Sequence, residues 1–372
     1  MINVYMLPAD EGDFLWVSYG MKKKHHILID GGMESSGEEY SQIVNRICQR
    51  EETIEAIILT HIDSDHLAGA IKGISLLSKE TLEAVVKNIY FNTSRGYLRH
   101  EGNDVAKEGY AEDEVTVNVR EEGYSVGEAI AFLELLKEKG IKDRLVDYVV
   151  AGQTIDFAEG ASAKILSPDR KCLQGLSEKW ENYRSKRQTF GYAPNLENVR
   201  KNLKDLMGEK LTYDSSINNA ASIAFLFEYA NSRIAFLGDA LPGVCVKGWD
   251  LFKEEMGKKV DLVKISHHGS RSNTSDTLLK RLGTENYLLS TNGNDGKVPS
   301  KIVLAHLLKR AQVKDKKTVL MCNYAWWELA YHGNYFTEQD QKEYLGKKLI
   351  LEELTEEGLA VKDGLIVYGE YD

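Results

Sequence analysis

The sequence predicts an α/β fold, because apolar runs of strand length alternate along the chain with segments of helical periodicity. Strands are expected at 26–30, 56–60 and 85–91, where β-branched and other apolar residues cluster. Between them, apolar residues recur at helical spacing over 37–50 and 67–77. A strand–helix–strand alternation of this kind builds a sheet with helices packed on its face.

The remaining expected elements extend this pattern. A polar turn joins two strands of an opening hairpin at 2–7 and 14–19. A helix is expected to open at Ser125, with Glu128 three residues later as the partner in a capping box. The other expected strands are 149–155, 163–168, 218–227, 233–240, 261–266, 318–322, 348–351 and 365–368.

Composition indicates a soluble globular protein. The chain has 372 residues with 42% hydrophobic content, enough for one large domain or two modest ones. It has no apolar run of about 18 residues, and its first residues lack the regions of a signal peptide, so we expect a cytoplasmic protein without membrane contact. The four cysteines are far apart, which favours neither a disulfide framework nor a thiolate zinc site: Cys48, Cys172, Cys245 and Cys322.

The net charge of −10 and the pI near 5.5 argue against a broad surface for non-specific polyanion binding. They do not exclude a nuclease, since bound divalent metals reverse the local charge of a carboxylate site.

One stretch concentrates candidate metal ligands. Directly after the strand ending at Thr60, four of six residues are His61, Asp63, Asp65 and His66. On an extended backbone the first two point to the same side, and the last two fall at the start of the next helix, where a carboxylate is favoured. An ordinary helix cap by Asp65 would explain one carboxylate but not the whole set. The pattern therefore predicts a metal site.

The pattern Thr-His-x-Asp-x-Asp-His-x-x-Gly, ending at Gly69, resembles the signature of the metallo-β-lactamase superfamily, with Asp63 in place of a second histidine. This variant is similar to the soluble hydrolase domain of bacterial DNA-uptake competence proteins. The resemblance implies an αββα sandwich of two mixed sheets flanked by helices. It covers residues 1–312, with insertions at about 95–123 and 169–215. Residues 313–372 are expected to be a C-terminal extension packed on the same domain.

The resemblance also implies the rest of the ligand set. Asp239, in a Gly-Asp pair after a strand, would bridge two metals, and the His-His-Gly-Ser run from His267 is close to the competence-type subgroup. Neighbouring side chains alternate in direction on an extended chain. We therefore expect His267 to complete the second metal site with Asp65 and His66, and His268 to contact a phosphate oxygen or to protonate the leaving group.

The superfamily usually supplies one more histidine ligand downstream. The only nearby candidate, His100, lies in a polar stretch where an exposed histidine is the default expectation. The first metal would then be held by His61, Asp63 and the bridging carboxylate. Asp30, before two glycines, is expected either to accept a hydrogen bond behind the site or to form a turn.

Three carboxylates against three imidazoles make a hard ligand set. Compared with more histidine-rich sites, which prefer zinc, this set shifts the preference towards manganese or magnesium. We expect two divalent ions, either manganese or zinc, and magnesium is also suitable. Two ions about 3.5–4 Å apart could share a hydroxide that attacks phosphorus. We therefore expect a metal-dependent phosphodiesterase, most of all a nuclease acting on DNA or RNA. The alternatives are a hydrolase of small esters, such as lactones, thioesters or phosphocholine-like diesters, and a non-catalytic metal-binding interaction module.

Between residues 169 and 215 basic residues are interleaved with aromatics, which is typical of contact with a nucleic-acid backbone and bases. Acidic residues offset their charge, so a solvated helical insertion is the favoured interpretation. The segment is nonetheless where we expect substrate specificity. Its basic and aromatic residues include Trp180, Tyr183, Arg184, Lys186, Arg187, Arg200, Lys201, Lys204 and Lys210.

Overall fold

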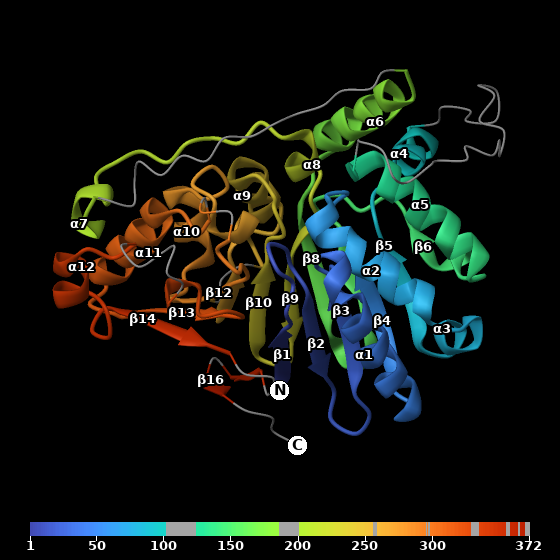
Figure 1. Ribbon diagram of the computed structural model, residues 1–372, viewed down its shortest axis with the longest axis horizontal. Helices are drawn as coiled ribbons and strands as arrows, with labels where there is room; N and C mark the ends of the chain where they lie inside the picture. Colours follow the sequence, from blue (N-terminus) through green and yellow to red (C-terminus); the bar gives the residue numbers. More distant parts are fainter. Residues whose placement is uncertain are drawn as a thin grey trace.

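The computed structural model describes residues 1–101, 124–185, 201–255, 259–294, 296, 298–328, 335–354, 358–363 and 365–368. These residues form four layers, in which two eight-stranded sheets lie face to face and helices cover their outer sides (Figure 1). Each sheet contains parallel and antiparallel pairs. The predicted αββα sandwich is therefore confirmed. Residues 102–123 and 186–200, which include parts of both predicted insertions, lie outside the described residues.

The first sheet combines the two ends of the chain. Its strands, in spatial order, are β16 (Leu365–Tyr368), β15 (Leu359–Lys362), β1 (Ile2–Met6), β2 (Leu15–Tyr19), β3 (His25–Ile29), β4 (Thr53–Ile58), β5 (Val86–Tyr90) and β6 (Leu145–Val146). Pairs from β16 to β3 are antiparallel, and those from β3 to β6 are parallel. The helices that pack on it are α1 (Gly37–Gln49), α2 (Ser64–Leu76), α3 (Lys79–Val85) and α5 (Tyr124–Glu138).

The order of the second sheet is β14 (Leu349–Glu353), β13 (Thr318–Cys322), β12 (Asn286–Leu289), β11 (Leu262–Lys264), β10 (Ser232–Phe236), β9 (Ala224–Tyr229), β8 (Ser162–Ser167) and β7 (Thr154–Asp156). The sheet is parallel from β14 to β10 and antiparallel from β10 to β7. Its outer face carries α9 (Pro242–Leu251), α10 (Asp276–Leu282) and α11 (Lys301–Val313). The shorter or peripheral helices are α4 (Ser94–His100), α6 (Arg170–Ser185), α7 (Leu203–Leu206), α8 (Ile217–Ala220) and α12 (Glu338–Glu343).

Three apolar clusters fill the spaces between the four layers. The central one joins the two sheets and contains Val17, Phe225 and Leu288, all buried. The other two lie between each sheet and its helices. Strands buried on both faces need apolar side chains on both, which explains why so many of them read as continuous apolar runs.

The C-terminal strands belong to both sheets. The expected strands at 318–322, 348–351 and 365–368 are present, but β15 was not anticipated. It pairs with β1, with Ile2 opposite Val361, and β16 adds to its other side. Four residues with a charged end give too short a pattern for confident prediction from sequence alone.

The expectation of a strand at 149–155 is wrong. Only Thr154–Asp156 form a strand there, and a separate two-residue strand, β6, precedes it. Gly152 has a φ of 96°, and the amide of Val150 donates a hydrogen bond to Gln153 Oε1. The chain therefore turns in this region instead of remaining extended.

No helix among the described residues has the length and apolar character needed to cross a lipid bilayer. All four cysteines are free, and Cys245 and Cys322 are buried.

A buried histidine in the first sheet predicts a pH dependence of stability. Trp16 Nε1 donates to His26 Nδ1 over 3.0 Å, which requires that nitrogen to be unprotonated. Burial lowers the pKa of His26 to about 4, although Glu52 opposes the shift. The unfolded chain takes up a proton below about pH 6.5 and the folded chain does not, so the free energy of unfolding should fall from pH 6.5 to 4, by up to about 3 kcal/mol.

Denaturant unfolding of metal-free protein across this range measures the effect, with His26→Gln as a variant that does not titrate at this position. The wild type should lose more free energy of unfolding than the variant between these two pH values. Equal losses would contradict the assignment of a neutral, buried imidazole.

Candidate metal centre

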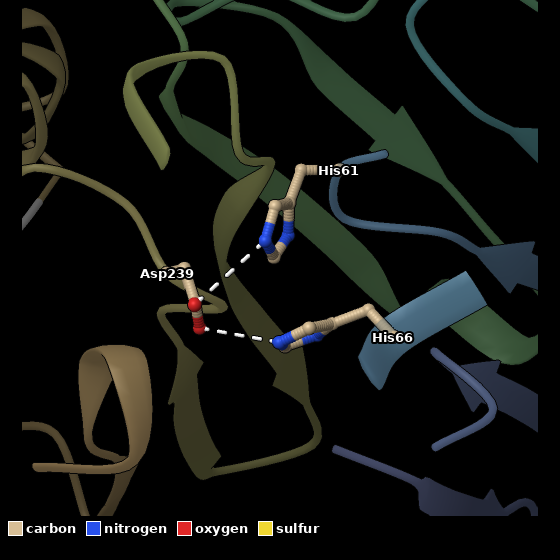
Figure 2. Close-up of side chains that lie close together, drawn as sticks. All are labelled: His61, His66 and Asp239. Carbon is tan, nitrogen blue, oxygen red and sulfur yellow. Dashed lines mark ion pairs between the residues drawn. The ribbon is translucent and has the colours of Figure 1, made fainter. Parts of the chain in front are cut away.

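The candidate site lies where strands of both sheets end. His61 follows β4, His66 is in the first turn of α2, Asp239 follows β10, and His267 and His268 follow β11. Parallel strands present their carboxyl ends at one edge of a sheet, so residues from distant parts of the chain meet there. Figure 2 shows the Asp239 carboxylate between the imidazoles of His61 and His66.

The two oxygens of Asp239 face different neighbours. Oδ2 lies 3.7 Å from His61 Nε2, which is 3.5 Å from Asp63 Oδ2; we call these three residues the first cluster. Oδ1 lies 3.4 Å from His66 Nε2. His66 Nε2 is 3.7 Å from Asp65 Oδ2, and the same oxygen is 3.4 Å from His268 Nε2. Asp65, His66, His268 and Asp239 form the second cluster, so Asp239 is common to both.

Several buried polar atoms at this centre have no hydrogen-bond partner and are of the kind that binds metal ions. Among the described buried side chains, His61 Nε2, His66 Nε2, His268 Nε2 and Asp239 Oδ1 have no hydrogen-bond partner. Buried polar atoms are rarely left unsatisfied, and here four of them face one small volume. Each belongs to a residue type that binds divalent metals.

The other ring nitrogen of each histidine is held as a donor. His66 Nδ1 donates to Asp30 Oδ2 over 2.8 Å and His268 Nδ1 donates to the carbonyl of Ser290 over 2.9 Å. The hydroxyl of Thr60 donates to Asp30, so its oxygen accepts from His61 Nδ1. This fixes the tautomer that leaves Nε2 for a metal or a proton, an arrangement typical of metal-ligating histidines.

Asp30 has both of its expected roles. Its side chain is fully buried and accepts from the amide of Thr60, the hydroxyl of Thr60 and the ring of His66. Its backbone φ is 57°, so it also sits in the left-handed conformation of a turn residue. The same residue therefore bends the chain and orients the metal-binding loop.

The carboxylates of the motif do not serve as an ordinary helix cap. Asp63 occupies the cap position of α2, yet its side chain makes no capping hydrogen bond. Only glycine fits at position 69, since a Cβ there would lie 1.9 Å from the Gly31 carbonyl oxygen. The amide of Gly31 in turn donates to the His66 carbonyl over 2.8 Å, which packs β3 and α2 tightly beside the site.

The structure reverses the expected placement of His267 and His268. Both have positive φ, 49° and 50°, so the chain is no longer extended and the argument from alternating directions does not apply. His268 joins Asp65 and His66 in a group whose ligand atoms lie within 4.8 Å of one another, and no such group found among the described residues contains His267. His267 instead lies at the rim, 33% exposed, with Nε2 3.7 Å from Asp239 Oδ2.

His100 does not supply the missing downstream histidine. His100 ends α4, is half exposed, and stacks on Tyr148 at a ring distance of 3.8 Å. The first cluster accordingly has one imidazole, from His61, and two carboxylates, from Asp63 and Asp239, and is harder than the second cluster.

An ion pair behind the second cluster was not anticipated. Lys264 and Asp13 are both about 1% exposed and pair directly, and Asp13 Oδ1 lies 3.4 Å from His268 Nδ1. Burial opposes ionisation of Asp13, but the Lys264 ammonium and the His268 ring more than offset it and hold its pKa well below the usual range. A lysine within the apolar run of β11 was the available sequence signal.

Three further side chains near the motif were missed or misassigned. Asn218 donates through Nδ2 to Asp63 Oδ1, and its Oδ1 accepts from Lys179 Nζ over 2.7 Å. Burial lowers the pKa of Lys179, while Asp63 opposes the shift. Glu128 does not cap α5, which begins at Tyr124; it accepts from the Ser64 hydroxyl over 2.8 Å, and burial raises its pKa to about 7.

The electric field of the site favours cations. Burial disfavours a charged imidazole on His268, but Asp13 and Asp239 prevail and raise its pKa to about 10. Burial also lowers the pKa of His66, but the carboxylates of Asp239 and Asp30 outweigh burial and raise that pKa well above its usual value. A proton and a metal ion compete for the same Nε2 atoms, so metal binding should release protons.

The reversed histidines predict different outcomes for two matched substitutions. His268→Asn should remove the ion of the second cluster, since the variant loses a buried Nε2 that faces Asp65. His267→Asn should retain the wild-type metal content, because its ring lies at the rim. Metal analysis after reconstitution with Mn²⁺ and gel filtration distinguishes the two. Loss of one ion from the His267 variant and none from the His268 variant would restore the original assignment.

Comparison with known proteins bears on this site. Residues 16–117, which contain the motif from His61 to His66, match the sequence model of the metallo-β-lactamase superfamily. A search of curated proteins gave no match.

The chain is similar to several solved structures, three of which follow. Zn²⁺-bound PqqB from Methylobacterium extorquens is 12% identical, with 99% of each chain covered and a TM-score of 0.38. The metallo-β-lactamase fold protein YhfI from Bacillus subtilis is 8% identical, with 98% of each chain covered and a TM-score of 0.38. CmlA, a diiron β-hydroxylase from Streptomyces venezuelae, is 11% identical, with a TM-score of 0.40. The alignment covers 84% of this chain and 51% of CmlA.

The family match includes the ligand motif, and the two sheets place that motif at the edge where Asp239 and His268 also lie. Residues 16–117 are therefore similar to the metallo-β-lactamase superfamily, and the two-sheet sandwich is the fold that this similarity implies.

Proposed function

We propose that the protein is a metal-dependent phosphodiesterase that cleaves nucleic acid. The observation that supports it most is the Asp239 carboxylate, whose two oxygens each face a separate set of buried, unpartnered ligand atoms. Such an arrangement suits two divalent ions held close together. Pairs of ions of this kind polarise a phosphoryl oxygen and lower the pKa of a water molecule.

The ligand set favours a phosphodiester over a neutral ester. The three motif and bridging carboxylates, Asp63, Asp65 and Asp239, balance part of the charge of two divalent ions and leave a net positive site. An anionic phosphodiester is attracted to such a site more strongly than an uncharged lactone or thioester. The carboxylates also favour manganese or magnesium over softer metals.

The side chains around the centre define where the substrate enters. His61, His66, Asp239 and His268 are buried, whereas the side chains of Asp63, Asp65 and His267 are 30%, 31% and 33% exposed. The open edge therefore runs past these three residues.

His267 is the group placed to give a proton to the leaving oxygen. Its Nδ1 donates to Asn273 Oδ1 over 2.9 Å, and both hydrogens of the Asn273 amide are used by Asp214 and the Asp239 carbonyl. The amide orientation is thereby fixed, so the His267 ring is held with Nε2 beside the metal centre, 3.7 Å from Asp239 Oδ2. Protonation of an alcohol leaving group is a typical histidine role.

The test is cleavage of linear double-stranded DNA, single-stranded RNA and bis(p-nitrophenyl) phosphate by purified protein with Mn²⁺, beside Asp65→Ala. Cleavage by the wild type alone supports the proposal. If the wild type holds metal but hydrolyses only lactones, thioesters or phosphocholine-like diesters, the small-ester alternative replaces it. Metal binding without hydrolysis of any of these substrates would favour a non-catalytic interaction module.

A further inference from the structure

The first cluster includes a ligand whose direction is set by residues far away in the chain. Asp63 stands where the superfamily signature has a histidine, and an aspartate side chain is shorter and can rotate. Its Oδ2 lies 3.5 Å from His61 Nε2, on the side of the cluster, while its Oδ1 accepts from Asn218 Nδ2. The hydrogen bond to Oδ1 therefore helps to hold Oδ2 toward the cluster.

The orientation of the Asn218 amide is determined in turn by Lys179. An ammonium group can only donate, and Lys179 Nζ lies 2.7 Å from Asn218 Oδ1. The amide oxygen must therefore face the lysine, and the NH₂ group must face Asp63. With a neutral or apolar side chain at position 179, the amide could turn and present its oxygen to the carboxylate, which would repel it.

The three residues come from separate elements that are held against one another. Asn218 is on α8 and is 4% exposed, Lys179 is on α6, and Asp63 precedes α2. The amide of Ile223, just after α8, donates to the Thr60 carbonyl over 2.8 Å. This contact holds the α8 segment beside the metal-binding loop, and the hydrogen bond between Lys179 and Asn218 links that segment to α6.

We infer that Lys179 and Asn218 are positioning residues that orient Asp63 for the first cluster, and that they make metal binding in that cluster depend on helix α6. This inference rests on the proposed metal centre. It assigns a role to a lysine of the 169–215 segment that the sequence analysis did not single out. Residues that orient metal ligands from behind typically contribute 10–100-fold, as an order of magnitude, to metal affinity.

The experiment is a calorimetric titration of metal-free protein with MnCl₂, combined with metal analysis after gel filtration. Asn218→Leu should weaken the binding of one Mn²⁺ by about 10–100-fold and leave the other unchanged. Lys179→Met should weaken the same ion to a smaller extent, and Lys179→Arg should restore most of the loss. Lys171→Met, on the exposed face of the same helix, is the matched control and should match the wild type.

Two combinations separate positioning from general structural support. If the residues act in series through Asp63, the double variant Lys179→Met/Asn218→Leu should bind Mn²⁺ no more weakly than Asn218→Leu alone. Adding Asn218→Leu to Asp63→Ala should cause no further loss. Should Asn218→Leu fail to fold, Lys179→Met, which replaces a partly buried side chain with one of similar length, carries the same test.

Two results would overturn the inference while leaving the proposed function intact. One is wild-type Mn²⁺ affinities for both ions in the Lys179→Met and Asn218→Leu variants. The other is a strictly additive loss in the double variant. By contrast, a wild-type protein that binds no Mn²⁺ would remove the metal centre itself, and with it the proposed function.

Discussion

Asp239→Asn is expected to lower hydrolysis of bis(p-nitrophenyl) phosphate by at least about a hundredfold. The substitution keeps the shape of the side chain and the hydrogen bond from the Asp239 amide to Ser222 Oγ, at 3.0 Å. It removes the negative charge that faces His61 through one oxygen and His66 through the other. Both clusters therefore lose a ligand together.

The comparison should include Asp205→Asn, an exposed carboxylate on α7 whose loss should leave the rate unchanged. Circular dichroism would establish that both variants remain folded. A rate within about threefold of the wild type for Asp239→Asn would contradict a shared carboxylate at the centre of the reaction, because several kcal/mol of charge stabilisation is expected from such sites.

Lys264→Met is expected to lower the free energy of unfolding by about 3–5 kcal/mol, measured by denaturant unfolding of the metal-free protein. The reason is that Asp13 would remain as a buried carboxylate without its cation, since both side chains are about 1% exposed. Its other charged neighbour, His268 Nδ1, is 3.4 Å away and donates to the Ser290 carbonyl.

The double variant Asp13→Asn/Lys264→Met tests the cause. Removing both charges should recover part of the lost free energy, because a buried pair replaced by neutral groups costs less than one left half-paired. A loss of less than about 1 kcal/mol for Lys264→Met alone, the range of exposed pairs, would show that the pair does not behave as a buried one.

The fold and much of the site could be predicted because their signals are local. The motif from His61 to His66 lies within six residues after a buried strand, and Asp239 also ends a strand, so their convergence follows from the sheet. Asp30 could be predicted because it ends a strand directly before two glycines. The strand at 359–362 left too short a pattern, and the turn at Gly152 interrupted a run that otherwise reads as extended.

What the sequence did not reveal depends on backbone conformation or on distant partners. The positive φ angles of His267 and His268 exchange their expected positions, and no periodicity predicts such angles in residues other than glycine. Asn218 and Lys179 contact each other across 39 positions, and Asn218 contacts Asp63 across 155. The similarity to competence-type hydrolases, the domain limits and the substrate remain predictions.

The measurement that tests the central claim most directly is the metal content of the purified protein after reconstitution with Mn²⁺ and, separately, with Zn²⁺. The two clusters joined by Asp239 predict two ions per chain for the wild type with at least one of these metals. They predict fewer for Asp239→Asn under the same conditions. A wild-type protein that retains no metal, or an Asp239 variant that retains two ions, would contradict the account of a centre bridged by this carboxylate.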